Sequence, residues 1–293
     1  MCDTDSINDM IEYQLKSGVS RRQFTALTVG AGVLPLFPSI AGAGDVVESE
    51  VNITTPDGTA DAYFVHLAKG KYPAVLIWPD IFGLRPAFRL MGKRLAESGY
   101  SVLVVNPFYR TKKAPTAPEY PDWNDPATRS ALMSLMHTLT PQTTYTDAQV
   151  FVAWLDKQPS VDTKRKMATT GYCMGGPLTM RTAATVPNRV GAGASFHGGS
   201  LVTDKPDSPH LLVPKMKAQY LFAIAANDDQ SAPDVKNVLR ETFTKAQLPA
   251  EIEVYEGTLH GWCPIDSQVY NRDQAEKAWS RMLALFKTAL ASR

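Results

Sequence analysis

The sequence has few cysteines, no excess of charge of either sign and no long hydrophobic run. Its 293 residues contain three cysteines, too few for a disulfide framework or a cysteine-rich zinc site. The 30 basic and 29 acidic side chains leave a net charge of +1, which argues against a nucleic-acid partner, because such proteins usually carry a strong basic excess. The apolar run over residues 26–37 is shorter than the about 20 residues that a transmembrane helix needs.

The composition that remains is that of a soluble globular protein. Hydrophobic residues make up 44% of the chain and charged residues 20%, so a sizeable core can form without disulfides. No internal repeat is visible. These properties leave an enzyme or a binding domain as the classes to consider.

The N-terminal stretch has the parts of an export signal. The segment Ser20–Thr25 contains a pair of arginines followed by a phenylalanine, then come the apolar residues 26–37 and the small residues 41–43. This order resembles a twin-arginine signal, which implies the twin-arginine export machinery as a partner and a periplasmic or otherwise exported protein. We therefore expect residues 1–43 to be a cleaved signal and residues 44–293 to be one domain. An ordinary amphipathic helix and an uncleaved membrane anchor are the alternatives.

The remaining chain alternates between short β-rich runs and helical patterns. Residues 46–54 and 60–67 flank a Pro-Asp-Gly turn and predict an antiparallel hairpin. Such alternation predicts an α/β fold with a mostly parallel central sheet and helices on both faces. The proline-rich segment 107–123 is expected to be a long loop at the carboxyl edge of the sheet, where such loops often act as functional lids. The further strands are expected at 74–78, 101–106, 167–172, 191–196, 219–225 and 252–255, and the helices at 88–98, 144–158, 178–184 and 275–291.

A glycine-rich turn between a predicted strand and a predicted helix holds Cys173. The segment 171–176 reads Gly-Tyr-Cys-Met-Gly-Gly, which is the G-x-S-x-G nucleophile elbow with cysteine in the serine position. Gly171 and Gly175 allow the strand and helix to approach closely, and the N-terminus of the helix favours the thiolate. A tight turn with a buried structural cysteine is the alternative, and we favour a nucleophile.

A base and an orienting acid are expected to follow the nucleophile in the order acid, then histidine. His260 lies between the last strand and the last helix, where this fold places its base. Asp228 and Asp229 both follow the penultimate strand, and the sequence leaves open which of them orients the histidine, although we take Asp228 first. His197, at the end of another strand, precedes both and is expected to be a hydrogen-bonded structural histidine.

With these residues in view, the chain resembles the dienelactone hydrolase family of the α/β-hydrolase superfamily. The resemblance rests on the Cys173 elbow, the segment Asp-Ile-Phe-Gly-Leu at 80–84, the segment Asn-Pro-Phe-Tyr-Arg at 106–110, the acid loop and His260, and it spans nearly all of residues 46–290. It implies an α/β-hydrolase fold and hydrolysis of the ester bond of small lactones through a Cys-Asp-His triad. It needs no metal and no cofactor.

The resemblance also implies roles for individual residues. Cys173 would be the nucleophile, His260 the base and then acid, and Asp228 the orienting acid, while the backbone N–H groups of Ile81 and Met174 would form the oxyanion hole. Asp80 stands where the family has a glutamate that contacts the thiol, and Pro264 stands where it has the second of two carboxylate-binding arginines. The candidate substrate-binding residues are Asp80, Phe82, Tyr109, Arg110 and Trp262.

We therefore expect a monomeric, exported hydrolase of small esters or lactones, without a nucleic-acid partner and without stable membrane insertion once the signal is cut. Another acyl-transfer or peptidase activity of the same triad, a non-catalytic binding domain and a redox-sensing thiol are the alternatives. Cys263 lies three residues after His260 and is expected to point away from Cys173, leaving the nucleophile reduced in an oxidising compartment.

Overall fold

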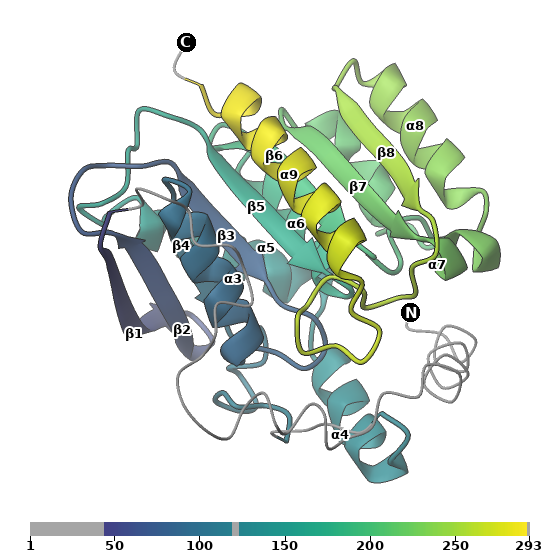
Figure 1. Cartoon of the computed structure of the whole chain (residues 1–293), viewed down its shortest axis with the longest axis horizontal. Coiled ribbons are helices and arrows are strands. Elements are labelled where there is room, and N and C mark those ends of the chain that lie inside the picture. Colours follow the sequence, from purple (N-terminus) through teal and green to yellow (C-terminus); the bar gives the residue numbers. More distant parts are fainter. Residues whose placement is uncertain (1–43, 119–122, 292–293) are drawn as a thin grey trace.

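An eight-stranded sheet organises the structure, in the order β1-β2-β4-β3-β5-β6-β7-β8. The computed structural model describes residues 44–118 and 123–291 (Figure 1). β1 and β2 form an antiparallel hairpin, β2 pairs antiparallel with β4, and all further pairs are parallel. The predicted fold class is confirmed. The strands are β1 Val46–Thr55, β2 Gly58–Leu67, β3 Ala74–Trp78, β4 Ser101–Val105, β5 Met167–Tyr172, β6 Val190–Phe196, β7 Gln219–Ala225 and β8 Ala250–Tyr255.

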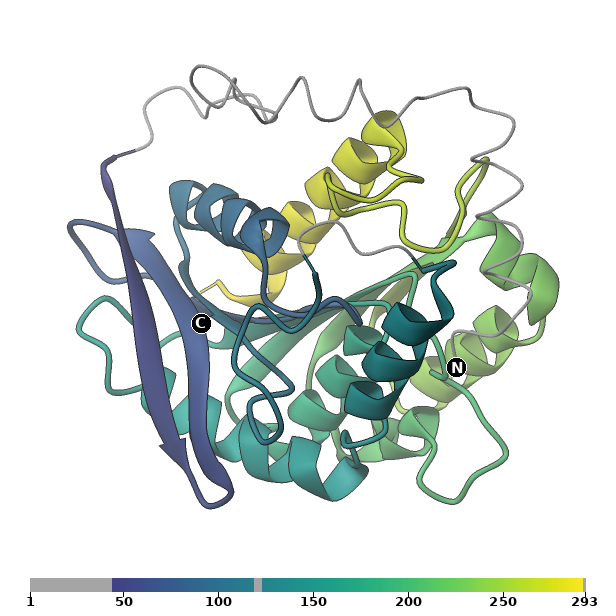
Figure 2. The same cartoon turned by 90° about the horizontal axis from the view of Figure 1, so that it is seen from below.

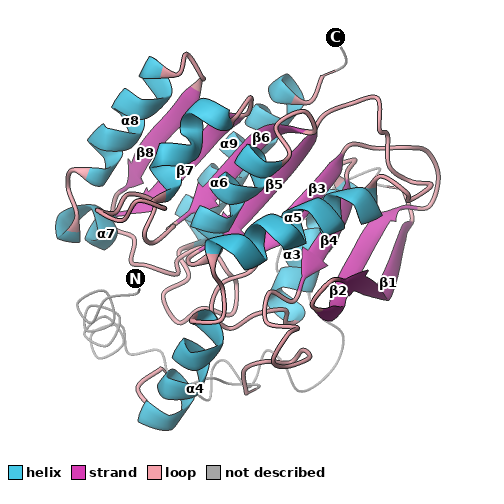
Figure 3. Cartoon of the chain, turned by 180° about the vertical axis from the view of Figure 1, so that it is seen from behind, coloured by secondary structure: helices cyan, strands magenta, loops and turns pink. Residues whose placement is uncertain are grey.

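Helices cover both faces of this sheet. α3 and α9 lie on the face that is toward the viewer in Figure 1. α5, α6 and α8 cover the opposite face, which is toward the viewer in Figure 3. Side chains alternate between these faces along each strand, so that in β4 Leu103 and Val105 join one core cluster and Val102 and Val104 join the other. The helices are α3 Pro86–Glu97, α4 Pro126–Met136, α5 Pro141–Leu155, α6 Gly175–Thr185, α7 Ala226–Ser231, α8 Val235–Lys245 and α9 Arg272–Ala289, with a 3-10 helix, η1, at Pro209–Lys215.

Capping residues explain where two helices begin. α5 starts three residues earlier than the apolar spacing predicts, because Thr140 forms a reciprocal capping box with Thr143 and a proline occupies the first turn. α4 follows the proline-rich loop, and its N-cap Asp125 accepts hydrogen bonds from the backbone N–H groups of Ala127 and Thr128. The predicted elements include no helix at α4, α7 or α8. In α8 the signal was present and was missed, since Val235, Leu239 and Phe243 recur at helical spacing and Leu239 and Phe243 are buried.

α4 occupies a place apart from the two helical layers. Figures 1 and 2 show it beyond the carboxyl ends of the central strands, on the side toward which the arrow of β5 points. This is the edge of the sheet where open α/β folds bind their ligands. The predicted loop at 107–123 is therefore followed by a helix that stands over the same edge.

The proposed signal, residues 1–43, lies outside the described residues. No helix in the described ranges is long and apolar enough to cross a membrane. The expected division between a cleaved signal and a domain at 44–293 stays a prediction from the sequence.

Candidate active site

Cys173 sits on a strained turn between β5 and α6. Its φ is +54°, in the left-handed region that residues other than glycine rarely adopt. A Cβ at Gly171 would lie 2.1 Å from the carbonyl oxygen of Gly175, and a Cβ at Gly175 would lie 2.3 Å from the carbonyl oxygen of Trp78. Both positions therefore require glycine, because the turn presses the start of α6 against the ends of β3 and β5.

A chain of contacts joins the cysteine to the histidine loop. The backbone N–H of Cys173 donates to the carbonyl oxygen of Phe196 at 3.0 Å, at the end of β6. The next residue, His197, has its ring centroid 5.0 Å from that of His260 in an edge-to-face arrangement. Cys173, His197 and His260 are all buried. The loops after β5, β6 and β8 are thus linked in sequence at the carboxyl edge of the sheet, through the backbone of Cys173 and the ring of His197.

The structure distinguishes the two adjacent aspartates. His260 Nδ1 lies 2.8 Å from Asp228 Oδ2 and 3.0 Å from Asp228 Oδ1. Asp229 instead forms an ion pair with Lys236, whose Nζ is 2.6 Å from Asp229 Oδ1. Of the two carboxylates, Asp228 is the one in position to fix the imidazole tautomer.

Asn227 supports the same loop and was not singled out by our sequence analysis. Its side-chain oxygen accepts a hydrogen bond from the backbone N–H of His260 at 2.8 Å, and the residue is buried. This bond holds the backbone of His260 while Asp228 holds its ring. Its place immediately before Asp228 is the only signal in the sequence that could have pointed to it.

The candidate oxyanion donors belong to residues that pack in the same cluster as Cys173. Ile81 follows β3 by three residues and Met174 follows Cys173, and all three residues belong to one apolar cluster. No hydrogen bond from the backbone N–H of Ile81 or of Met174 is found within the described residues. Two backbone donors beside a nucleophile are the arrangement that stabilises a developing oxyanion.

His197 differs from our expectation of a hydrogen-bonded structural histidine. Its φ is +39°, and neither ring nitrogen has a hydrogen-bond partner within the described residues. Burial, reinforced by the charge of His260 when that ring is protonated, holds the pKa of His197 well below its ordinary value. Burial therefore favours the neutral ring, which packs edge to face against His260.

Asp80 is engaged by an arginine. Arg85 binds both of its carboxylate oxygens, with Nη1 2.6 Å from Oδ1 and Nη2 3.0 Å from Oδ2, and the backbone N–H of Phe82 donates to Oδ1 at 3.0 Å. Burial raises the pKa of Asp80, and the charge of Arg85 opposes that shift. Through Arg85 and the Phe82 N–H, this carboxylate holds its own loop.

The candidate anion-binding residue Arg110 lies in a second, partly buried network. Its guanidinium contacts Asp147 of α5 at 2.7 Å and Asp57, in the β1–β2 turn, at 2.6 Å. Tyr109 donates its hydroxyl hydrogen to the same Asp147 at 2.8 Å, and Asp147 is itself buried. Tyr109 and Arg110 therefore connect the loop after β4 to α5, and Arg110 also connects it to the β1–β2 turn. The sequence contains these carboxylates but does not show that they meet the arginine.

The two candidate aromatic residues have different surroundings. Phe82 packs against the cluster that contains Cys173 and meets Trp123 edge to face, with centroids 6.2 Å apart. Trp262 is fully buried on the α3–α9 face and stacks on Tyr255 with centroids 4.8 Å apart. Phe82 thus lies near the thiol, whereas Trp262 is part of the core.

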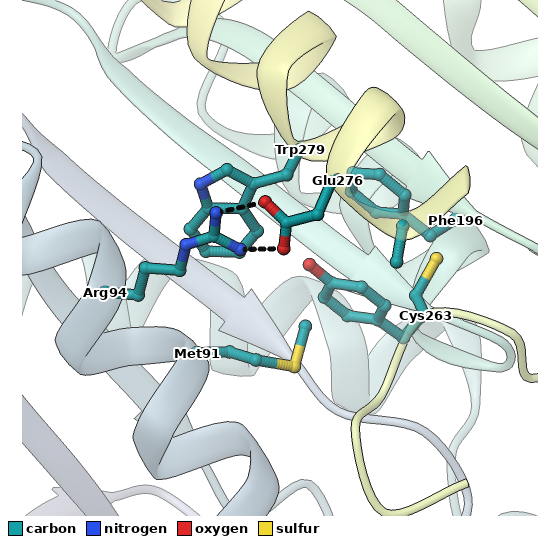
Figure 4. A pocket seen from close by; sticks show the side chains of 8 residues that line it. Met91, Arg94, Phe196, Cys263, Glu276 and Trp279 are labelled. Carbon is teal, nitrogen blue, oxygen red and sulfur yellow. Dashed lines mark hydrogen bonds and ion pairs between the residues drawn. The ribbon is translucent and has the colours of Figure 1, made fainter. Parts of the chain in front are cut away.

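The second cysteine is separated from the first. Neither Cys173 nor Cys263 forms a disulfide, and the two belong to different apolar clusters. Cys263 lines a small cavity of about 10 Å³ between α3 and α9, beside Met91 and Phe196 (Figure 4). Burial raises the pKa of the Cys263 thiol well above its ordinary value, which favours the protonated thiol over the nucleophilic thiolate.

Apolar side chains surround the thiol. We call this group the thiol cluster; it combines the elbow, the loop after β3, the loop after β4 and α4. The thiol cluster consists of Ile81, Phe108, Ala117, Leu132, Leu135, Cys173 and Met174, with Phe82, Trp123, Met133, Met136 and Leu139 packed against it.

Within residues 44–118 and 123–291, no three His, Cys, Asp or Glu side chains are grouped so that they could hold a metal ion.

The sequence is similar to those of known proteins over most of its length. A model of the dienelactone hydrolase family matches residues 60–290. A protein from Synechocystis sp. is 27% identical over 229 residues, which cover 76% of this chain and 89% of that protein. A carboxymethylenebutenolidase from Rhodococcus opacus is 24% identical over 238 residues, covering 80% of this chain and 88% of the enzyme.

A solved structure has the same fold at lower identity. It is a dienelactone hydrolase-like promiscuous phosphotriesterase from metagenomic libraries, 19% identical, with a TM-score of 0.69 over 85% of this chain and 100% of that one. The family model covers most of the sequence, including the elbow, the acid loop and the histidine loop. This chain belongs to the dienelactone hydrolase family and is a hydrolase.

Proposed function

We propose that the protein hydrolyses small esters or lactones through a Cys173 thioester. The observation that carries the proposal is a cysteine on a strained elbow, at the same edge of the sheet as a buried histidine whose Nδ1 lies 2.8 Å from Asp228. A nucleophile, a base and an orienting acid in this order on this fold are the parts of acyl transfer.

The reaction begins with transfer of the Cys173 proton to His260 Nε2, while Asp228 stabilises the imidazolium. The thiolate attacks the carbonyl carbon, and the carbonyl oxygen becomes an oxyanion held by the N–H groups of Ile81 and Met174. The bond to the alcohol oxygen then breaks as His260 returns its proton to that oxygen. An acyl thioester on Cys173 remains.

Deacylation repeats these steps with water. His260 Nε2 takes a proton from a water molecule, whose oxygen attacks the thioester carbon. The second tetrahedral intermediate collapses with loss of the Cys173 sulfur, which takes back the proton from His260. The carboxylic acid leaves, and the resting enzyme is restored.

The surroundings of the thiol favour an uncharged substrate. The thiol cluster consists of apolar side chains around Cys173. Arg110 is occupied by Asp57 and Asp147, and Pro264 offers no charge where the family has its second arginine. We propose that the acyl part of the substrate is small and apolar, in contrast to a substrate bound through its carboxylate.

The sequence also supports a proposal about where the enzyme works. Residues 1–43 would direct export through the twin-arginine machinery, and the mature domain would act as a monomer in the periplasm on a small molecule. Replacement of Arg21 and Arg22 together by lysine is expected to leave the protein in the cytoplasmic fraction. Equal amounts of both forms in the periplasm would contradict the export proposal.

A panel of p-nitrophenyl esters and lactones tests the activity. Cys173→Ala and His260→Ala are each expected to lower kcat/KM by at least about 10³-fold without loss of folding. Mass spectrometry of the quenched reaction is expected to find the acyl group on the peptide that contains Cys173. Unchanged turnover in both variants would rule out the triad, and labelling of Cys263 alone would rule out Cys173 as nucleophile.

A further inference from the structure

Arg85 joins two loops of the site through its side chain. All five of its N–H hydrogens are used. Nη1 and Nη2 bind Asp80, while Nε and Nη2 bind Asp266, at 2.6 and 3.0 Å in each case, and Nη1 also reaches the carbonyl oxygen of Gly83 at 3.4 Å. Two bidentate contacts leave the guanidinium no donor for a substrate carboxylate.

The two carboxylates belong to the two loops that the proposed reaction uses. Asp80 immediately precedes Ile81, the candidate oxyanion donor after β3. Asp266 lies between His260 and α9. Arg85 is the N-cap residue of α3, and its hydrogen bonds to Asp80 and Asp266 connect the first of these loops to the second.

Local contacts make the first loop rigid around this arginine. Asp80 accepts from the backbone N–H of Phe82, and its carbonyl oxygen accepts from the backbone N–H of Gly83 at 2.9 Å. The guanidinium carbon also lies 4.8 Å from the centre of the Phe88 ring. The turn that contains Ile81 is thus held by Arg85, which Asp266 holds in turn.

The geometry points to Arg85 as a positioning residue that ties the Ile81 loop to the His260 loop and thereby fixes the Ile81 N–H beside the thiol. This inference rests on the proposed function, because the Ile81 N–H matters only if an oxyanion forms. Asp80 then serves as an anchor for the arginine. A displacement of about 1 Å in a catalytic group is able to lower turnover about 10²-fold, so the tie has a measurable consequence.

The chain offers a matched pair of ion pairs for the test. Asp266 is 33% exposed and pairs with Arg85, which is 12% exposed. Glu276 is 32% exposed and pairs in a bidentate manner with Arg94, which is 10% exposed (Figure 4). Both pairs join α3 to the C-terminal part of the chain, but only the first contacts the Ile81 loop. Asp266→Ala and Glu276→Ala therefore remove equivalent carboxylates.

Asp266→Ala is expected to lower kcat for an ester about tenfold with little change in KM, whereas Glu276→Ala keeps kcat within about twofold. Alkylation of Cys173 by iodoacetamide forms no oxyanion, so its rate is expected to stay unchanged in both variants. Hydrogen exchange of the amides at 81–85 is expected to speed up in Asp266→Ala alone. A purely stabilising role of Asp266 would not separate turnover from alkylation.

Three results would overturn the inference: an equal loss of kcat in both variants, a parallel loss of the alkylation rate in Asp266→Ala, or unchanged exchange at 81–85 in that variant. If the wild-type protein hydrolyses no ester, the proposed function fails on its own account. The exchange measurement then still decides whether Arg85 ties the two loops.

Discussion

Replacement of Asp228 by asparagine gives the sharpest test of the proposed triad, because its neighbour Asp229 is a built-in control. The carboxylate accepts the Nδ1–H of His260 at 2.8 Å, which leaves Nε2 as the base. An asparagine amide in the same place is able to donate to Nδ1 and to hold the proton on Nε2. The histidine would then keep its position but lose its ability to accept the thiol proton.

The expected losses for the two aspartates differ by orders of magnitude. In serine triads the same change lowers kcat about 10⁴-fold. Cysteine is more acidic than serine and depends less on its base, so we expect a loss of about 10²–10³-fold for Asp228→Asn, equivalent to about 3–4 kcal/mol. Asp229 forms a partly exposed ion pair with Lys236, whose contribution to stability is at most about 1 kcal/mol. Asp229→Asn is therefore expected to keep kcat within about twofold.

The assay is steady-state hydrolysis of a p-nitrophenyl ester by both variants, with the melting temperature of each measured in parallel. Asp228→Asn is expected to fold as the wild type does, since His260 keeps its hydrogen bond to Asn227 through the backbone. A larger loss of turnover in Asp229→Asn than in Asp228→Asn would refute the assignment of the acid. Equal turnover in all three proteins would refute the role of the His260–Asp228 pair altogether.

Three further predictions concern the elbow, the buried histidine and the thiol cluster. Gly175→Ala places a Cβ 2.3 Å from the carbonyl oxygen of Trp78, so urea titration is expected to find a loss of about 1–3 kcal/mol together with loss of turnover; normal stability would contradict the close approach. Burial keeps His197 neutral in the folded protein, so as pH falls below about 6.5 only the unfolded chain takes up a proton at this residue, and the free energy of unfolding falls. His197→Phe is expected to remove up to about 2 kcal/mol of the decrease in the free energy of unfolding between pH 7 and 5. An unchanged pH dependence would contradict this. Met133→Arg adds a cation to the thiol cluster and is expected to raise kcat/KM for esters with a carboxylate in the acyl part about fivefold relative to kcat/KM for uncharged esters. Ala131→Arg, at an exposed position of the same helix, is expected to leave this ratio unchanged. Equal shifts in both variants would refute the proposal that the thiol cluster selects an apolar acyl group.

The elbow could be predicted because its chemistry and its backbone are encoded in one short segment. The glycines on either side of Cys173 allow the close approach of β3, β5 and α6, and only this spacing on a strand–turn–helix presents a nucleophile in this way. The place of His260 after the last strand follows in the same manner from the order of the elements. Local sequence is enough where a function needs a particular turn at a particular end of a strand.

The roles of charged side chains were harder to predict, because ion pairs join residues far apart in the chain. Arg110 has the right position to bind a substrate anion, but Asp57 and Asp147 reach it from the hairpin turn and from α5. Asp80 likewise meets Arg85, whose second partner Asp266 comes from the other side of the site. A sequence shows which charges exist and does not show which of them neutralise each other.

The amino-acid sequence by itself contains few cysteines, no excess of charge and no long apolar run, and it was enough to predict an α/β fold and a nucleophile elbow at Cys173. Those features follow from composition, from the period of apolar residues and from local turn chemistry. Only the tertiary structure decided that Asp228 rather than Asp229 meets His260, that His197 is buried without a hydrogen-bond partner in the described residues, and that Arg85 links two loops. These contacts depend on how loops from separate strands converge at one edge of the sheet, and that convergence is set by the packing of the whole domain.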